Sequence, residues 1–214
     1  MKNFLDYKVI LWDFDGVIMD SMPIRSNGFS LVLKSYPEEQ VKELMDFHNL
    51  NGGLSRYVKF RHFFENIRGE AITEEQVQEH ANSFSKIMLE ALIDENLLIK
   101  DSVRFIENNW DKYEMHIVSG SDGNELRQIC DALDLTRYFK SINGSPTPKK
   151  QLVKNLFLEW KYDSKDTLLI GDSINDAEAA EFNGIDFIAY NNPLLAADFE
   201  YLNSFSNLSS SKNV

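Results

Sequence analysis

Short apolar runs recur along the chain, each bounded by polar or turn-forming residues, and their length is that of strands rather than helices. Four of these runs are rich in valine, isoleucine, leucine and aromatic residues, and a less apolar fifth run lies between the second and third of them. The predicted strands cover residues 9–12, 116–118, 141–143, 167–170 and 187–189.

Helical repeats separate the later strands. Apolar residues return every three or four positions between these strands, as an amphipathic helix requires. They are Val103, Ile106 and Trp110, then Leu126, Ile129, Cys130 and Leu133, and then Val153, Leu156, Phe157 and Trp160. The alternation of strands and helices predicts an α/β fold with a doubly wound, Rossmann-like parallel sheet and helices on both faces.

A long helical stretch interrupts this alternation after the first strand. Roughly 80 residues there carry helical repeats and no strand pattern, with predicted helices over 24–36 and 38–48, another around 54–64, and a last one after the capping box TEEQ at Thr73. We therefore predict a core of residues 1–19 and 97–214 and an inserted α-helical cap of residues 20–96. Asp20 and Ser21 are predicted to cap the first helix of the insertion.

The net charge of −12 limits the partners of the protein. Such a charge repels nucleic acid and anionic membrane surfaces, and it also means that a phosphorylated metabolite would need local cations in order to bind. A lone cysteine, Cys130, allows no internal disulfide, and no apolar run reaches the 18 residues of a membrane span. We expect a cytoplasmic protein.

Polar and glycine residues follow the predicted strands where each strand ends. In chain order they are Asp13, Asp15, Gly16, Ser119, Gly120, Lys149, Lys150, Asp172 and Asp176. The carboxyl ends of parallel strands meet at one edge of a sheet, and chemistry gathers at that edge. We therefore expect carboxylates, a hydroxyl and an amine to converge there.

These residue types suit a metal ion beside a phosphate. The carboxylates of Asp13 and Asp172, with a backbone carbonyl, are hard oxygen ligands of the kind that Mg²⁺ prefers. A cation between Asp13 and Asp15 would also offset the repulsion of two carboxylates so close together. Ser119 and the amides near Gly120 can donate to phosphate oxygens, and a lysine can offset the remaining charge.

Other readings of these loops fail on spacing. A calcium-binding helix–loop–helix needs an oxygen at its fifth position and a glutamate at its twelfth, where this chain has Val17 and Ile24. The phosphate loop of nucleoside triphosphatases, the dinucleotide-binding G-x-G-x-x-G and the G-x-S-x-G nucleophile elbow are all missing. The four histidines do not have the spacing of zinc ligands.

The same loops resemble the motifs of haloacid-dehalogenase-superfamily phosphatases with a helical cap. Among these, the sequence is similar to phosphoglycolate phosphatases and β-phosphoglucomutases. DFDGVIMDS, from Asp13, is similar to the first motif, IVSGS to the second and GDSINDAEAA to the fourth. The third motif is a lysine before a helix, which falls on Lys149 or Lys150. We favour Lys149, because Lys150 is predicted to lie in the first turn of the following helix.

This resemblance implies aspartyl-phosphate chemistry. Asp13 would attack phosphorus, and Asp15 would protonate the leaving oxygen and then activate water. Ser119 and Lys149 would orient and neutralise the phosphoryl group.

The resemblance also implies a Mg²⁺ site and residues around the substrate. Asp13, Asp15 through its carbonyl, and Asp172 would hold the ion, while Asp176 would steady the lysine or a metal-bound water. Gly16 and Gly120 are expected beside the substrate. In the predicted cap, GGLSRYVKFR brings Arg56, Lys59 and Arg61 into an acidic protein. Family caps select substrate near this place, so Arg56 and Lys59 are candidate substrate contacts, with a solvated basic face as the alternative.

The resemblance therefore implies a Mg²⁺-dependent hydrolase of a small phosphate monoester, such as a sugar phosphate or phosphoglycolate. A phosphosugar mutase similar to β-phosphoglucomutase is the nearest alternative, because it shares the same motifs. A receiver-type signalling module and a non-catalytic phosphate-binding protein are more remote alternatives.

Overall fold

The strands of the protein form a single parallel sheet. The computed structural model describes the backbone of residues 3–211 and the side chains of residues 3–208. Within this part of the chain, the sheet has six strands in the order β3-β2-β1-β4-β5-β6. Their bounds are β1 Val9–Trp12, β2 Glu114–Asp122, β3 Ser141–Ser145, β4 Thr167–Gly171, β5 Asp186–Tyr190 and β6 Tyr201–Leu202.

The strand order places the first strand in the centre. β1 pairs in parallel with β2 on one side, where Trp12 is opposite Ile117, and with β4 on the other, where Trp12 is opposite Ile170. All five predicted strands are present, and most are a few residues longer than their apolar runs. The two-residue β6 is too short to show a period-two pattern, so the sequence analysis did not find it.

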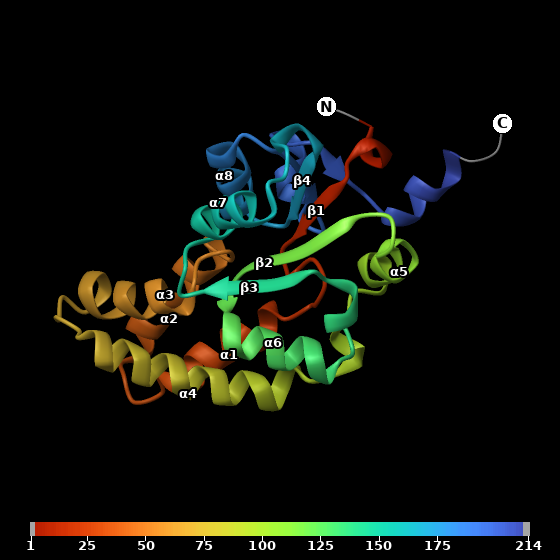
Figure 1. The fold of residues 1–214 in the computed structure, drawn as a ribbon. Helices are drawn as coiled ribbons and strands as arrows, with labels where there is room; N and C mark the ends of the chain where they lie inside the picture. Colours follow the sequence, from red (N-terminus) through yellow and green to blue (C-terminus); the bar gives the residue numbers. More distant parts are fainter. Residues whose placement is uncertain (1–2, 212–214) are drawn as a thin grey trace.

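Helices cover both faces of this sheet (Figure 1). α7 and α8 pack on one face, against the side chains of Val9 and Leu11, while α5 and α6 share a second apolar core with Ile10 and Trp12. The alternation along β1 is what a strand buried on both faces requires. The bounds are α5 Lys100–Asn109, α6 Gly123–Ala132, α7 Lys149–Trp160 and α8 Ile174–Asn183. The predicted doubly wound α/β fold is confirmed.

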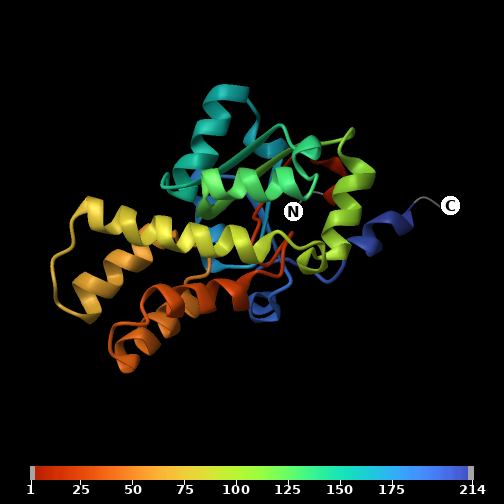
Figure 2. The same cartoon turned by 90° about the horizontal axis from the view of Figure 1, so that it is seen from below.

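The stretch between β1 and α5 is helical, apart from short connections, and its helices lie together beside one end of the sheet (Figures 1 and 2). Phe29, Phe84 and Met88 pack between these helices and join the core that contains Trp12. Figure 2 shows the longest of them, α4, running alongside α6. The bounds are α1 Met22–Val32, α2 Glu38–Leu50, α3 Arg56–His62 with a π-helical continuation Phe63–Ile67, and α4 Glu74–Leu92.

The helix ends in this stretch agree only in part with the sequence prediction. The capping box before α4 is confirmed, because Thr73 and Gln76 each accept a hydrogen bond from the other's backbone N–H. Ser21 occupies the N-cap position of α1, as predicted, but its hydroxyl donates to the carboxylate of Asp15 and makes no capping hydrogen bond within the described residues. The first helix ends at Val32 rather than at residue 36.

Cys130, the single cysteine, is buried, and burial raises the pKa of its thiol to about 12. Within residues 3–211, the helices are all too short or too polar to cross a lipid bilayer. The division into a core and a cap at residues 20–96 stays a prediction, and its outer ends at 1–2 and 212–214 lie outside the described residues.

Candidate active site

Three carboxylates meet at the carboxyl edge of the sheet. Asp13 follows β1, Asp172 follows β4, and Asp176 lies in the first turn of α8. One carboxylate oxygen of each lies within 4.8 Å of the others. The strand-end residues that the sequence placed at one edge are therefore brought together by the parallel register of β1 and β4.

A lysine bridges two of these carboxylates. Lys149, the first residue of α7, has its Nζ 2.9 Å from Asp13 Oδ1 and in contact with Asp176 Oδ1, and its side chain is buried. Lys150 instead points to the surface, where its Nζ lies 3.3 Å from Glu178. The structure thus places Lys149, and not Lys150, beside Asp13.

The electrostatics of this cluster fit a divalent cation. Burial and the carboxylate of Asp176 raise the pKa of Asp13 to about 7, although Lys149 opposes the shift. Burial and Asp13 likewise raise the pKa of Asp172. The single positive charge of Lys149 does not balance the negative charges of three ionised carboxylates. A hard cation among their oxygens would favour the ionised forms. These residues could therefore hold Mg²⁺.

Asp176 is already engaged on both oxygens. Its Oδ1 contacts Lys149, and its Oδ2 accepts hydrogen bonds from Ser173 Oγ at 2.6 Å and from the Ser173 backbone N–H at 3.1 Å. A carboxylate with both oxygens engaged suits orientation of the lysine better than direct ligation of a metal. Asp13 and Asp172 are the better candidates for the latter.

Gly16 has a steric role beside the cluster. Its φ is +75°, and a Cβ at this position would lie 1.9 Å from Oδ2 of Asp172. Any side chain here would displace that carboxylate, so Gly16 lets the first and fourth motifs approach each other. Asn191 holds the same turn by donating from Nδ2 to the carbonyl of Gly16 at 2.9 Å.

Ser119 and Gly120 lie at the same edge on the neighbouring strand. Ser119 is fully buried near the end of β2, two residues after Ile117, and its Oγ accepts a hydrogen bond from the Ser121 backbone N–H at 3.1 Å. Gly120 faces the helical stretch, because a Cβ there would lie 2.3 Å from the carbonyl oxygen of Gly53. The loop before α3 thus rests on the end of β2.

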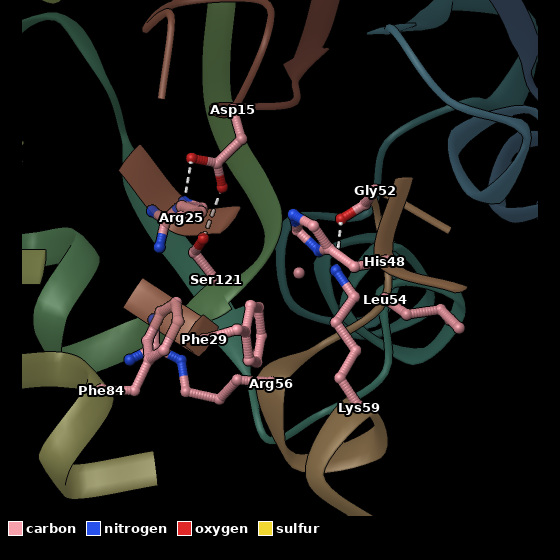
Figure 3. Close-up of a pocket in the computed structure, with 11 residues that line it drawn as sticks. Asp15, Arg25, Phe29, His48, Gly52, Leu54, Arg56, Lys59, Phe84 and Ser121 are labelled. Carbon is pink, nitrogen blue, oxygen red and sulfur yellow. Dashed lines mark hydrogen bonds and ion pairs between the residues drawn. The ribbon is translucent and has the colours of Figure 1, made fainter. Parts of the chain in front are cut away.

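Asp15 points toward Arg25 and Ser121 (Figure 3). Its Oδ1 accepts hydrogen bonds from Ser21 and from Arg25 Nε, the latter at 2.5 Å, and its Oδ2 accepts one from Ser121 Oγ at 2.5 Å. Burial alone would raise the pKa of Asp15, but Arg25 and the two hydroxyls outweigh it and lower the pKa. The carboxylate is therefore held ionised in this arrangement.

Arg56 and Lys59 line the same small cavity as Asp15 and Arg25 (Figure 3). Arg56 is not free to bind an anion there, because its two terminal nitrogens lie 2.5 and 2.8 Å from the carboxylate oxygens of Glu125. Lys59 donates to the carbonyl of Gly52 at 3.1 Å, and burial lowers the pKa of its amine to about 7. The cavity, of about 20 Å³, has room for a water molecule.

This region also contains buried charged residues that the sequence patterns did not identify. Arg25 and Glu125 are buried and pair with each other, with Arg25 Nη1 3.1 Å from Glu125 Oε1. Among the described residues, Arg25 Nη2 and both ring nitrogens of the buried His48 have no hydrogen-bond partner. Arg25 and Glu125 did carry a signal, since each is a charged residue at a helical spacing otherwise filled by apolar side chains.

Comparison with known proteins agrees with this geometry. The family model described as haloacid dehalogenase-like hydrolase matches residues 10–190. Phosphoglycolate phosphatase 1 of Pseudomonas aeruginosa is 24% identical over 191 residues, which cover 83% of this chain and 67% of that protein.

Solved structures share the fold at low sequence identity. CbbY from Rhodobacter sphaeroides in complex with phosphate has a TM-score of 0.75 at 13% identity, covering 95% of this chain and 96% of that one. β-Phosphoglucomutase from Clostridium difficile has a TM-score of 0.74 at 14% identity, covering 95% and 94%. The expectation that this chain is a phosphatase-type hydrolase is confirmed, and the chain belongs to the haloacid dehalogenase-like hydrolase family.

Proposed function

We propose that this protein is a Mg²⁺-dependent phosphatase that hydrolyses a small phosphate monoester through an aspartyl-phosphate on Asp13. The observation that carries the proposal is the contact of buried Lys149 with Asp13 and Asp176, next to Asp172, at the carboxyl edge of the sheet. A nucleophilic carboxylate, a fixed cation and a metal-binding carboxylate are what phosphoryl transfer to a side chain requires.

Asp13, Asp172 and the backbone carbonyl of Asp15 would hold the metal ion, with Asp176 in its surroundings. When bound, Mg²⁺ offsets the negative charge of the carboxylates and of the phosphate that approaches them. The raised pKa values of Asp13 and Asp172 support this assignment, because both carboxylates are ionised more easily beside a cation.

The proposed chemistry has two steps. Oδ1 of Asp13 accepts from the Phe14 backbone N–H at 2.8 Å and contacts Lys149, so Oδ2 is the oxygen that attacks phosphorus. The bond from phosphorus to the leaving oxygen breaks, and Asp15 donates a proton to that oxygen. Water then attacks the phosphorus of the aspartyl-phosphate, Asp15 takes a proton from it, and Asp13 is released together with inorganic phosphate.

Other residues bind the phosphoryl group and tune Asp15. Ser119 Oγ and Lys149 Nζ donate to the phosphoryl oxygens, with the amide of Gly120 beside them. The ionised Asp15 of this structure is the form that accepts the proton of water. The negative charge of an arriving phosphate favours protonation of Asp15, which the first step needs.

The helical stretch of residues 20–96 is proposed to be a cap that selects the substrate. The loop at Gly53 rests on Gly120, and the cavity beneath it has room only for a water molecule. A small monoester therefore enters when the helical stretch opens, and a phosphoprotein would need a much larger opening. Lys59 is the better candidate for a substrate contact. Arg56 lines the cavity as well, but Glu125 already binds its guanidinium on two nitrogens.

A panel of phosphorylated metabolites tests this function. We expect release of inorganic phosphate from a small monoester, such as phosphoglycolate or a sugar phosphate, that depends on Mg²⁺ and stops with EDTA. Conversion of a hexose 1-phosphate to the 6-phosphate without phosphate release would instead identify a phosphosugar mutase. Phosphate binding without turnover of any member of the panel would contradict both enzymes.

Gly16→Ala tests the metal site. The added Cβ would collide with Asp172, so we expect the Mg²⁺ concentration for half-maximal activity to rise at least about 10-fold. Gly69→Ala is the matched control: Gly69 also has a positive φ, +67°, but nothing lies within 4 Å of its Cβ position. Both variants carry a backbone cost of about 1–2 kcal/mol. A Gly16→Ala enzyme with the Mg²⁺ dependence of Gly69→Ala would contradict the assignment.

A further inference from the structure

Arg25 is a buried cation that joins the helical stretch to the core of the protein. It lies on α1, only 5% exposed, on the same face as the buried Phe29. Its Nε lies 2.5 Å from Asp15 Oδ1, and its Nη1 lies 3.1 Å from Glu125 Oε1. Asp15 lies in the loop after β1, and Glu125 lies on α6. The guanidinium of Arg25 on α1 therefore bridges two carboxylates of the core.

Glu125 anchors this arrangement. It is 1% exposed on α6, and its oxygens also bind Arg56 from α3, whose Nη1 contacts Ser85 Oγ on α4 at 2.6 Å. The charges therefore alternate along Asp15, Arg25, Glu125 and Arg56, and each successive ion pair joins a residue of the core to a residue of the inserted helices. Buried ion pairs are costly compared with apolar packing, so this series of buried ion pairs points to a role beyond stability.

The orientation of the Asp15 carboxylate depends on this series of ion pairs. Ser121 donates to Asp15 from the end of β2, whereas Ser21 and Arg25 hold the same carboxylate from the start of α1. We propose that Arg25 is a positioning residue, fixed by Glu125, that orients the carboxylate of Asp15 for proton transfer to and from the substrate. Correct alignment of Asp15 then requires that the helical stretch be docked on the core.

This inference rests on the proposed function, and two substrates with different leaving groups allow the inference and the function to be tested separately. An alkyl phosphate needs a proton on its departing oxygen, whereas p-nitrophenolate leaves without one at neutral pH. Loss of the aligned acid must therefore slow the first substrate far more than the second. The measured quantity is kcat/KM for each substrate, because it reports the step in which the ester bond breaks, and the ratio of the two values is independent of the fraction of folded enzyme.

The experiment compares Arg25→Met with Asp15→Asn and with Arg61→Met. We expect Arg25→Met to lower kcat/KM about 100-fold for the alkyl phosphate that the wild type hydrolyses best and less than about 5-fold for p-nitrophenyl phosphate. Asp15→Asn should show the same selectivity, and Arg25→Lys should recover part of the loss. Arg61, whose ion pairs with Glu65 and Glu74 are solvent-accessible, is the control, and its variant should stay within about 2-fold on both substrates.

The outcomes are separable. An equal loss on both substrates in Arg25→Met would overturn the positioning role while leaving the phosphatase intact. Hydrolysis of neither substrate by the wild-type enzyme would overturn the proposed function itself. If Arg25→Met folds poorly, Arg25→Met/Glu125→Gln leaves less uncompensated buried charge, and the same ratio of kcat/KM values decides the question.

Discussion

Asp13→Asn is expected to abolish turnover. The amide is a poor nucleophile toward phosphorus, and loss of the nucleophile in enzymes with a covalent intermediate lowers kcat by at least about 10³-fold. Asn is close in size and can still accept the Phe14 backbone hydrogen bond that now goes to Oδ1 at 2.8 Å. The measurement is phosphate release under saturating substrate and Mg²⁺. It is paired with trapping of phosphate on the protein by acid quench, which the wild type should show and the variant should not.

The stability of the same variant shows whether inactivity reflects chemistry or folding. The pKa of Asp13 is raised from 3.8 to about 7, so its ionised form is disfavoured in the folded protein and its contribution to stability falls as the pH rises through 7. At pH 8 without metal, replacing that charge by an amide should leave Tm unchanged or raise it. An active Asp13→Asn enzyme would contradict the nucleophile, and a variant with a much lower Tm at pH 8 would contradict the electrostatic account of the cluster.

The sequence predicted those features of the site that depend on strand ends. Apolar runs located the strands, and the rule that parallel strands carry chemistry at their carboxyl edge predicted that Asp13, Asp172 and Lys149 lie close together. The preference for Lys149 over Lys150 rested on the family resemblance, whose third motif is a lysine before a helix. The expectation that the strand ends converge uses only neighbours in the chain and one general rule of sheet topology.

What the sequence could not supply is the pairing between distant charged residues. Arg25 and Glu125 each stand on the apolar face of a helix, which marks them as unusual, but nothing in either segment identifies the other as its partner. Their contact depends on how the inserted helices dock on α6, which is a tertiary property. The expectation for Arg56 met the same limit: its charge and its place in the loop were visible, whereas its engagement with Glu125 was not.

The capping hydrogen bond expected from the Ser21 hydroxyl is replaced by another contact for a related reason. Serine before a helix is a good local predictor of a capping hydrogen bond. Here the hydroxyl instead meets the ionised carboxylate of Asp15, and a hydrogen bond to a charged acceptor is stronger than one to a backbone amide of the first turn. A local propensity was overridden because the active site lies directly against the start of α1.

Lys149→Met is expected to damage both stability and activity. The Lys149 side chain is 5% exposed, and it is in contact with Asp13 and Asp176. Its removal leaves buried carboxylates without a cation, which costs about 3–5 kcal/mol when one partner of a buried pair is lost. The phosphoryl oxygens would also lose a fixed positive charge, so we expect kcat to fall at least about 100-fold. Denaturant unfolding of the metal-free protein and steady-state kinetics measure the two effects.

Lys150→Met is the matched control, since it removes the same side chain one residue further along α7. Its Nζ is 3.3 Å from Glu178 at the surface, so the variant should change the unfolding free energy by no more than about 0.5 kcal/mol and leave kcat unchanged. The loss in Lys149→Met should be smaller at pH 5 than at pH 8, because the orphaned carboxylates can then take up protons. Adding Asp176→Asn should restore part of the stability and none of the activity. Equal effects of Lys149→Met and Lys150→Met would show that the buried lysine does not balance the charge of the cluster.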